Sequence, residues 1–223
     1  KMEDQTIRWW DGSLRQWSPQ PDNLKIPFRD GSTVTHHISA EGGSDAGTMR
    51  FSITRMNNEP VVFNSNLNQT TINTNSTLKV SDKVSLNLSA SYMNYHRLNS
   101  PLLGEDPESF NKGLLYSWPR SYQGEDLENY ELADGTRNPQ AGYPYLYVDP
   151  YLWWKYYNNN TTLDRFKFLG SLALNYTITP WLSFTGRIGI DYTQDEFKSK
   201  NKPADLIGLL EGYYAESEQY DHS

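Results

Sequence analysis

The chain has 223 residues, a formal net charge of −7 and a mean hydropathy of −0.76. The negative charge excludes a general affinity for nucleic acid, which is dominated by Lys and Arg contacts to phosphates. Absence of cysteine excludes disulfide frameworks and cysteine-based metal sites. The sequence also lacks an apolar run of about 18 residues, so no transmembrane helix is expected.

The first predicted element is a hairpin with strands at about 33–41 and 48–56 around the turn EGGSDAG. Apolar residues alternate with polar ones, which is the signal of a half-buried strand. His36 interrupts the apolar face of the first strand. The other residues of that face are Val34, Ile38 and Ala40 before the turn and Met49, Phe51 and Ile53 after it.

Two longer hairpins follow, with strands at about 70–80 and 84–94, and at about 165–178 and 182–193. Their turns are the short segments SDK and TPW. Between them lies a long loop, about 95–164, rich in Tyr, Trp, Pro, Asn and acidic residues. A connection of this length argues against an ordinary compact domain.

These strands are long enough to cross a membrane. A tilted strand needs roughly 9–11 residues to span the hydrocarbon core, and short turns alternating with long loops are typical of outer-membrane barrels. We therefore expect an all-β fold that forms part of a large antiparallel transmembrane β-barrel, with short periplasmic turns and long extracellular loops. The residues expected to face lipid are Leu172, Leu174, Tyr176, Leu182, Phe184, Ile188 and Ile190.

Two alternatives remain open at this point. A soluble or surface-attached β-rich carbohydrate-binding module would also show period-two alternation, and so would a structural surface protein without a transport role. Neither accounts for strand length, loop asymmetry and the aromatic residues near both ends of the strands together.

The segment DRFKFLGSLALNYTITPWLSFTGRIGIDYT resembles a barrel hairpin of the SusC/RagA-like TonB-dependent transporters of Bacteroidetes. The segments WSPQPDN, FRDGSTVTHHISAEGGSDAGTMRFSIT and NLNQTTINTNSTLKVSDKVSLNLSASYMNY are similar to earlier barrel segments of that family, in the same order. The resemblance implies that residues 1–223 are a portion of the barrel domain, of about 22 strands in the full protein, without the plug domain.

The resemblance further implies import of a bulky nutrient, a glycan or an oligopeptide, through the cell outer membrane. The implied partners are a SusD-like surface lipoprotein, TonB acting through the plug segment, and outer-membrane lipid. No nucleic acid partner is expected.

The aromatic residues of the long loop are the candidate substrate- or partner-binding residues, because Tyr and Trp offer a large contact area with a polar group. Packing of the loop on itself or on the plug is the alternative. The candidates are Trp118, Tyr122, Trp153, Trp154, Tyr156 and Tyr157.

No catalytic residues are expected, because no nucleophile–base, phosphate-loop or zinc motif is present, and the protein is not expected to be an enzyme.

No cofactor is expected either. The acidic segments 104–109 and 124–135 offer oxygen ligands for a structural Ca²⁺ or Mg²⁺, but they lack the ordered spacing of an EF-hand, and ELADGT indicates a plain Asp-Gly turn. Adjacent His36 and His37 point to opposite faces of a strand and do not chelate one metal together.

Overall fold

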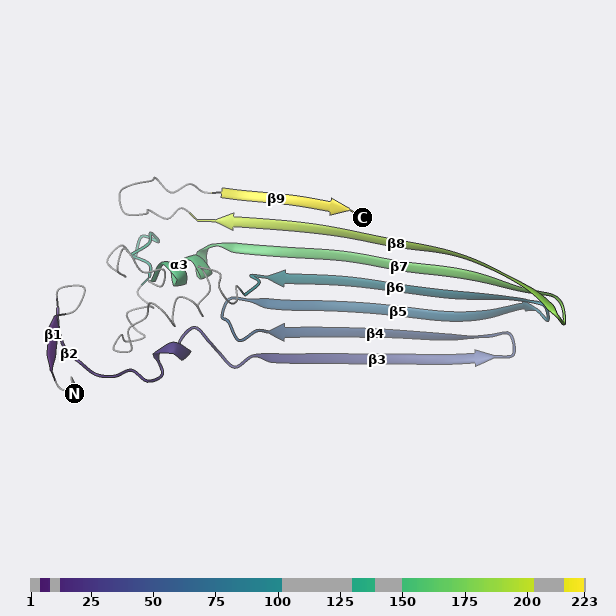
Figure 1. The fold of residues 1–223 in the computed structure, drawn as a ribbon, viewed down its shortest axis with the longest axis horizontal. Coiled ribbons are helices and arrows are strands. Elements are labelled where there is room, and N and C mark those ends of the chain that lie inside the picture. The colour runs from purple at the N-terminus through teal and green to yellow at the C-terminus, as the bar shows by residue number, and fades with distance from the viewer. Residues whose placement is uncertain (1–4, 9–12, 102–129, 139–149, 203–214, 223) are drawn as a thin grey trace.

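The computed structural model describes residues 5–8, 13–101, 130–138, 150–202 and 215–222. Its main feature is one seven-stranded antiparallel sheet in which every strand pairs with the next along the chain (Figure 1). The strands are β3 (Ser32–Ser44), β4 (Gly47–Glu59), β5 (Asn66–Ser81), β6 (Val84–Leu98), β7 (Asn160–Thr179), β8 (Leu182–Asn201) and β9 (Ala215–His222).

The smaller elements are a two-stranded sheet of β1 (Thr6–Arg8) and β2 (Leu14–Gln16), the short 3-10 helix η1 (Asn23–Lys25) and helix α3 (Pro150–Asn158). Helix α3 lies at the end of the sheet opposite the short turns (Figure 1). No helix in the described part of the chain is both long and apolar enough to cross a membrane.

All six strand ranges expected from the sequence lie inside strands of the sheet, but the strands extend further. The expected loop 95–164 is correspondingly wrong at both ends, because residues 95–98 belong to β6 and residues 160–164 to β7. Helix α3 also occupies part of that range. The extensions are mostly polar, and three of their apolar residues, Leu67, Leu163 and Phe197, lie on the face opposite the belt residues, so the alternation that reveals the rest of each strand does not continue into them.

The pairing register places the apolar residues of neighbouring strands side by side on one face of the sheet. One row across the sheet contains Ile53, Ile72, Tyr92, Phe168 and Tyr192, each the direct partner of the next. Both register shifts lie beside the short turns, at Lys79/Ser81 and Thr177/Thr179. The two faces therefore keep their identity along the whole length of the strands.

This apolar face, called the belt below, is exposed in the described residues. Its side chains include all seven that were expected to face lipid, with exposed fractions of 38% for Leu172 and Leu174, 40% for Tyr176, 42% for Leu182, 55% for Phe184, 71% for Ile188 and 57% for Ile190. At the margin of the belt nearest the long-loop end, called its upper margin below, the rings of Tyr92 and Tyr192 each contact Phe166, at 5.3 and 5.9 Å between centroids. Such an exposed apolar face requires a non-aqueous neighbour.

The short turns are staggered along the sheet (Figure 1). Gly47, which begins β4 directly after the first turn, lies in the same row as Gly186 of β8. The β7–β8 turn comes four residues beyond that row, at Leu182, and four strand intervals separate β4 from β8. The turns therefore shift by one residue, about 3.3 Å along the strand, for each strand-to-strand interval of about 4.8 Å. This stagger corresponds to a strand tilt of about 35° from the barrel axis.

That tilt lies at the lower end of the 35–45° found in membrane barrels. Along β8 the belt runs from Leu182 to Tyr192, ten residue steps. At about 3.3 Å per step and a tilt of about 35°, its height is about 27 Å, close to the apolar band of about 25 Å of membrane barrels. The chain thus has the all-β fold of a segment of a large antiparallel β-barrel, and the sheet is not closed within the described residues.

Cysteine pairs test this register in a chain that has no native cysteine. Ser89 and Ser171 are direct partners on the polar face, so their Cβ atoms are about 5 Å apart, whereas the diagonal pair Ser89 and Ala173 is about 7–8 Å apart. The S89C/S171C variant should form a disulfide on mild oxidation of the folded protein. The control S89C/A173C should form it much more slowly, as measured by mass spectrometry, and the opposite order would contradict the register.

Candidate functional site

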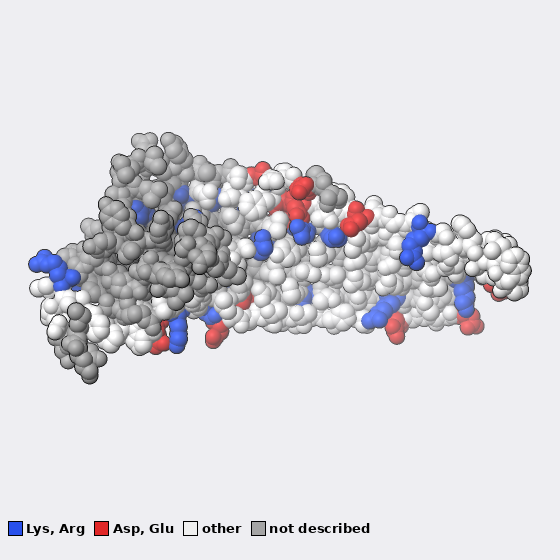
Figure 2. All heavy atoms as spheres, in the orientation of Figure 1, with Lys and Arg blue, Asp and Glu red and all other residues white. Residues whose placement is uncertain are grey.

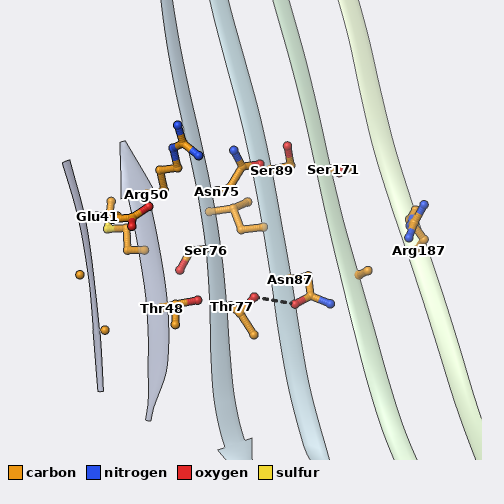
Figure 3. Close-up of a pocket in the computed structure, with 15 residues that line it drawn as sticks. Glu41, Thr48, Arg50, Asn75, Ser76, Thr77, Asn87, Ser89, Ser171 and Arg187 are labelled. Carbon is orange, nitrogen blue, oxygen red and sulfur yellow. Dashed lines mark hydrogen bonds between the residues drawn. The ribbon is translucent and has the colours of Figure 1, made fainter. Parts of the chain in front are cut away.

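The face of the sheet opposite the belt is polar and forms the first candidate site. Two cross-strand rows run along it, one through Arg50, Asn75, Ser89 and Ser171 and one through Thr48, Thr77, Asn87, Ala173 and Arg187. These rows line a hollow of about 780 Å³ (Figure 3). Small polar side chains keep the hollow open and offer hydroxyl and amide groups to whatever occupies it.

Hydrogen bonds between neighbouring strands hold these side chains in place. Thr77 donates to Asn87 at 3.0 Å, and Thr185 donates to Asn175 at 3.0 Å. Further along β7 and β8, Arg165 forms a two-pronged ion pair with Asp195, at 2.7 and 2.5 Å, on the same face. These contacts order the polar face, and the view in Figure 2 shows side chains of both charges distributed along the described sheet.

Arg50 and Arg187 lie at opposite sides of the hollow, and Glu41, the direct cross-strand partner of Arg50, places a carboxylate beside the first of them (Figure 3). The two arginines lie on β4 and β8, four strand intervals apart, which is about 19 Å at about 4.8 Å per interval. This separation is too large for one small anion to contact both guanidinium groups. The hollow suits an extended polar ligand or a protein surface instead.

The second candidate site is the loop cap, defined here as helix α3, the β4–β5 loop at 60–65 and residues 130–138. Its core contains Val62, Trp153 and Tyr156, against which Leu24, Ile26, Phe63 and Tyr130 pack. The cap is built at the long-loop end of the sheet (Figure 1).

Asparagine side chains attach the cap to the sheet. Asn99 donates to the carbonyl of Asn64 at 2.8 Å and to Oδ1 of Asn160 at 3.0 Å, while its own Oδ1 accepts from the backbone N–H of Thr161 at 2.8 Å. Asn64 in turn donates to the carbonyl of Tyr156. Asn64 and Asn99 have positive φ angles of 50° and 46°, a conformation that Asn tolerates better than most residues.

Lys202 makes a further attachment at the end of β8. Its ammonium group lies 3.5 Å from Glu131, 3.3 Å from Asn158 and 5.8 Å from the centroid of the Trp154 ring. Glu131 also accepts from Asn158 at 3.1 Å. One cation thus connects the β8 strand, helix α3 and the 130–138 segment.

Among the six predicted binding residues, Trp118 and Tyr122 lie outside the described residues. Trp153, Trp154 and Tyr156 are buried, with exposed fractions of 3%, 0% and 9%. Tyr157 is 45% exposed and stacks on Phe63 at 4.8 Å and on Tyr130 at 5.1 Å. Of the described four, Tyr157 therefore offers the most ring surface to a ligand, while the other three pack inside the cap.

The 131–137 segment is the Asp-Gly turn that the sequence predicts, with Gly135 at φ +80°. Asp134 accepts from the backbone and the hydroxyl of Thr136 at 2.9 and 2.6 Å, and these bonds lower the pKa of its carboxyl group. Burial raises the pKa of the Tyr130 hydroxyl, with smaller contributions from Tyr157 and Glu131. In the described ranges no three His, Asp or Glu side chains are grouped as a metal site.

The sequence pattern alone does not identify Arg50, Arg187, Asn99 or Lys202 as residues of either candidate site. The two arginines each fit the alternation of polar residues on a strand, so nothing in the local pattern singles them out. Asn99 and Lys202 lie beyond the expected strand ends, and their role depends on segments about 35 to 70 residues distant along the chain.

A search of family models found no match, and a search of curated proteins found none either. A search of solved structures found similarity to a chain of the RagAB peptide importer, in a structure of its closed-closed state. The TM-score is 0.62 at 17% sequence identity, over 87% of this chain and 22% of that chain. This likeness concerns the fold, and the chain spans less than a quarter of the length of the protein it matches.

Two tryptophans test whether the cap is a packed core. Trp154→Ala removes a ring that is 0% exposed, and replacing a buried Trp by Ala costs about 3–5 kcal/mol. Limited proteolysis of the full-length protein should show faster cleavage near residues 130–138. Trp181→Ala is the control, because Trp181 lies in the β7–β8 turn and is 82% exposed. Equal cleavage of the two variants would contradict a packed role for Trp154.

Proposed function

We propose that this chain is part of the wall and extracellular loops of an outer-membrane protein that imports a bulky nutrient. The observation that carries this proposal is the two-faced sheet. One face has an exposed apolar belt of about 27 Å height on strands tilted by about 35°, and the other is lined by Asn, Ser, Thr and Arg around a hollow. Lipid outside and water inside a barrel satisfy both faces.

The finer proposal is a SusC-like, TonB-dependent barrel that works with a SusD-like surface lipoprotein. Its support is the resemblance of the barrel segments and the similar fold of part of the RagAB peptide importer. The substrate is an oligopeptide or a glycan, captured at the loop end and passed along the polar face. The proposal contains no catalytic step.

A soluble carbohydrate-binding module is less compatible with the exposed belt. Its sheet would need a covering layer over Phe184, Ile188 and Ile190, whose exposed fractions are 55%, 71% and 57% in the described residues. The polar face, conversely, has a hollow where a sandwich would have its core.

Membrane insertion is tested by arginine substitutions at adjacent positions on β7. Leu174 lies five residues from the turn end of β7, near mid-belt, and Asn175 is on the opposite face. L174R should destabilise the full-length protein in lipid by about 2–4 kcal/mol, whereas N175R should have a much smaller effect. The measurement is urea unfolding in lipid vesicles, and equal losses would rule out lipid contact at Leu174.

Transport is tested with the full-length gene. A deletion strain should lose uptake of a labelled oligopeptide or of a labelled glycan, and the restored gene should recover it. Loss of neither would rule out the import function, even if the arginine series showed that the protein is in a membrane.

A further inference from the structure

We propose that Arg55 and His36 bind the phosphate of a lipid headgroup at the outer surface of the barrel. This inference rests on the proposed function, because it requires the belt to face lipid. Both residues are exposed and lie on the belt face, as direct partners on β4 and β3. In the next row toward the short turns are Ile38 and Ile53, so the two cationic groups adjoin the apolar surface.

The depth of Arg55 places its charge at the edge of the membrane. Arg55 lies eight residues from the first residue of β4, which is about 22 Å above the plane of the short turns at about 3.3 Å per residue and a tilt of about 35°. The upper margin of the belt at Tyr192 is at about 27 Å on the same basis. The backbone of Arg55 therefore lies about 5 Å below the margin, a distance that an arginine side chain spans.

The contacts of Arg55 show that its side chain extends in that direction. Its Nε donates to Oδ1 of Asn57 at 3.2 Å, and Asn57 lies two residues closer to the long-loop end. Its Nη1 donates to the Thr70 hydroxyl of the neighbouring strand at 2.7 Å. Both partners are neutral, and they leave further guanidinium N–H groups available to an anion.

No carboxylate in the described residues balances this charge. On the belt face, Glu59 lies four residues further along β4, about 13 Å away at about 3.3 Å per residue, and Asp164 is three strands away on β7, where it contacts His96 at 2.5 Å. The remaining neighbours in the row are Thr70 and Asn94. A negative charge that balances Arg55 can therefore come from a molecule that contacts the belt face from outside the sheet.

A lipid phosphate fits this position better than other anions. It is held at headgroup level by its acyl chains, whose natural neighbours are Ile38 and Ile53 below. Arg binds phosphate through two parallel N–H groups, and His36, the direct cross-strand partner of Arg55, provides a further N–H in either protonation state. The site thus combines the apolar side chains of Ile38 and Ile53 with the N–H donors of Arg55 and His36 at the edge of the belt.

The test uses the full-length protein in nanodiscs that contain a phosphorylated lipid and an otherwise matched glycolipid without phosphate. Native mass spectrometry measures which lipid stays bound when the protein is released. The wild-type protein should retain the phosphorylated lipid selectively. R55Q should retain about ten-fold less, as expected for loss of a charge-assisted contact, H36Q should retain less than wild type, and R55K should keep part of the binding.

The matched control is R50Q, which removes an arginine from the same strand but from the polar face. It should retain lipid like the wild type. Retention by R55Q equal to that of R50Q, or equal retention of both lipids by the wild type, would overturn the lipid site while leaving the import function standing. Dissociation of an oligomer by R55Q with unchanged lipid retention would assign Arg55 to a protein contact instead. Failure of the wild-type protein to enter nanodiscs would overturn the proposed function and this inference together.

Discussion

The constraint on which the rest of the structure depends is the unbroken two-residue period of the pairing between strands. Each strand of the seven-stranded sheet pairs directly with the next, and the register shifts at Lys79/Ser81 and Thr177/Thr179 lie beside turns. A shift in mid-strand would move every later side chain to the opposite face. Because none occurs there, the belt and the polar hollow are two consequences of one register.

The strands are longer than the belt, and the excess length has a structural use. β7 and β8 have 20 residues each, but the belt on β8 ends at Tyr192. Beyond it the same face carries Glu196 and Lys198, which are paired with each other at 2.6 Å. The upper part of the sheet is therefore suited to water, and it supports the loop cap away from the belt.

The alternation in residues 165–193 was sufficient to predict both strands, their turn and the face on which Leu174 and Ile188 lie. It could not predict residues 194–201, because a mostly polar strand has no alternation to detect. Helix α3 was missed for a different reason. The sequence PYLWWKYYN was interpreted as an aromatic contact surface, although Pro at the start of a helix is favourable and the three-residue spacing of Trp153 and Tyr156 places them on one helical face.

The positions that attach the cap could not be derived from local sequence. Asn99 acts through Asn64 and Asn160, which are 35 and 61 residues away along the chain, and only the folded sheet brings them together. The same applies to Arg50 and Arg187, which become opposite sides of one hollow only through four successive strand pairings.

The two edges of the sheet also constrain the complete protein. β3 and β9 each pair on one side only within the described residues, and an open edge leaves a row of backbone N–H and C=O groups without partners. In a membrane such groups need partners within the protein, because lipid provides none. If the belt faces lipid, further strands must therefore continue the sheet from both edges until it closes. Closure in turn requires the polar face, with its hollow and its two arginines, to be the inside of the barrel.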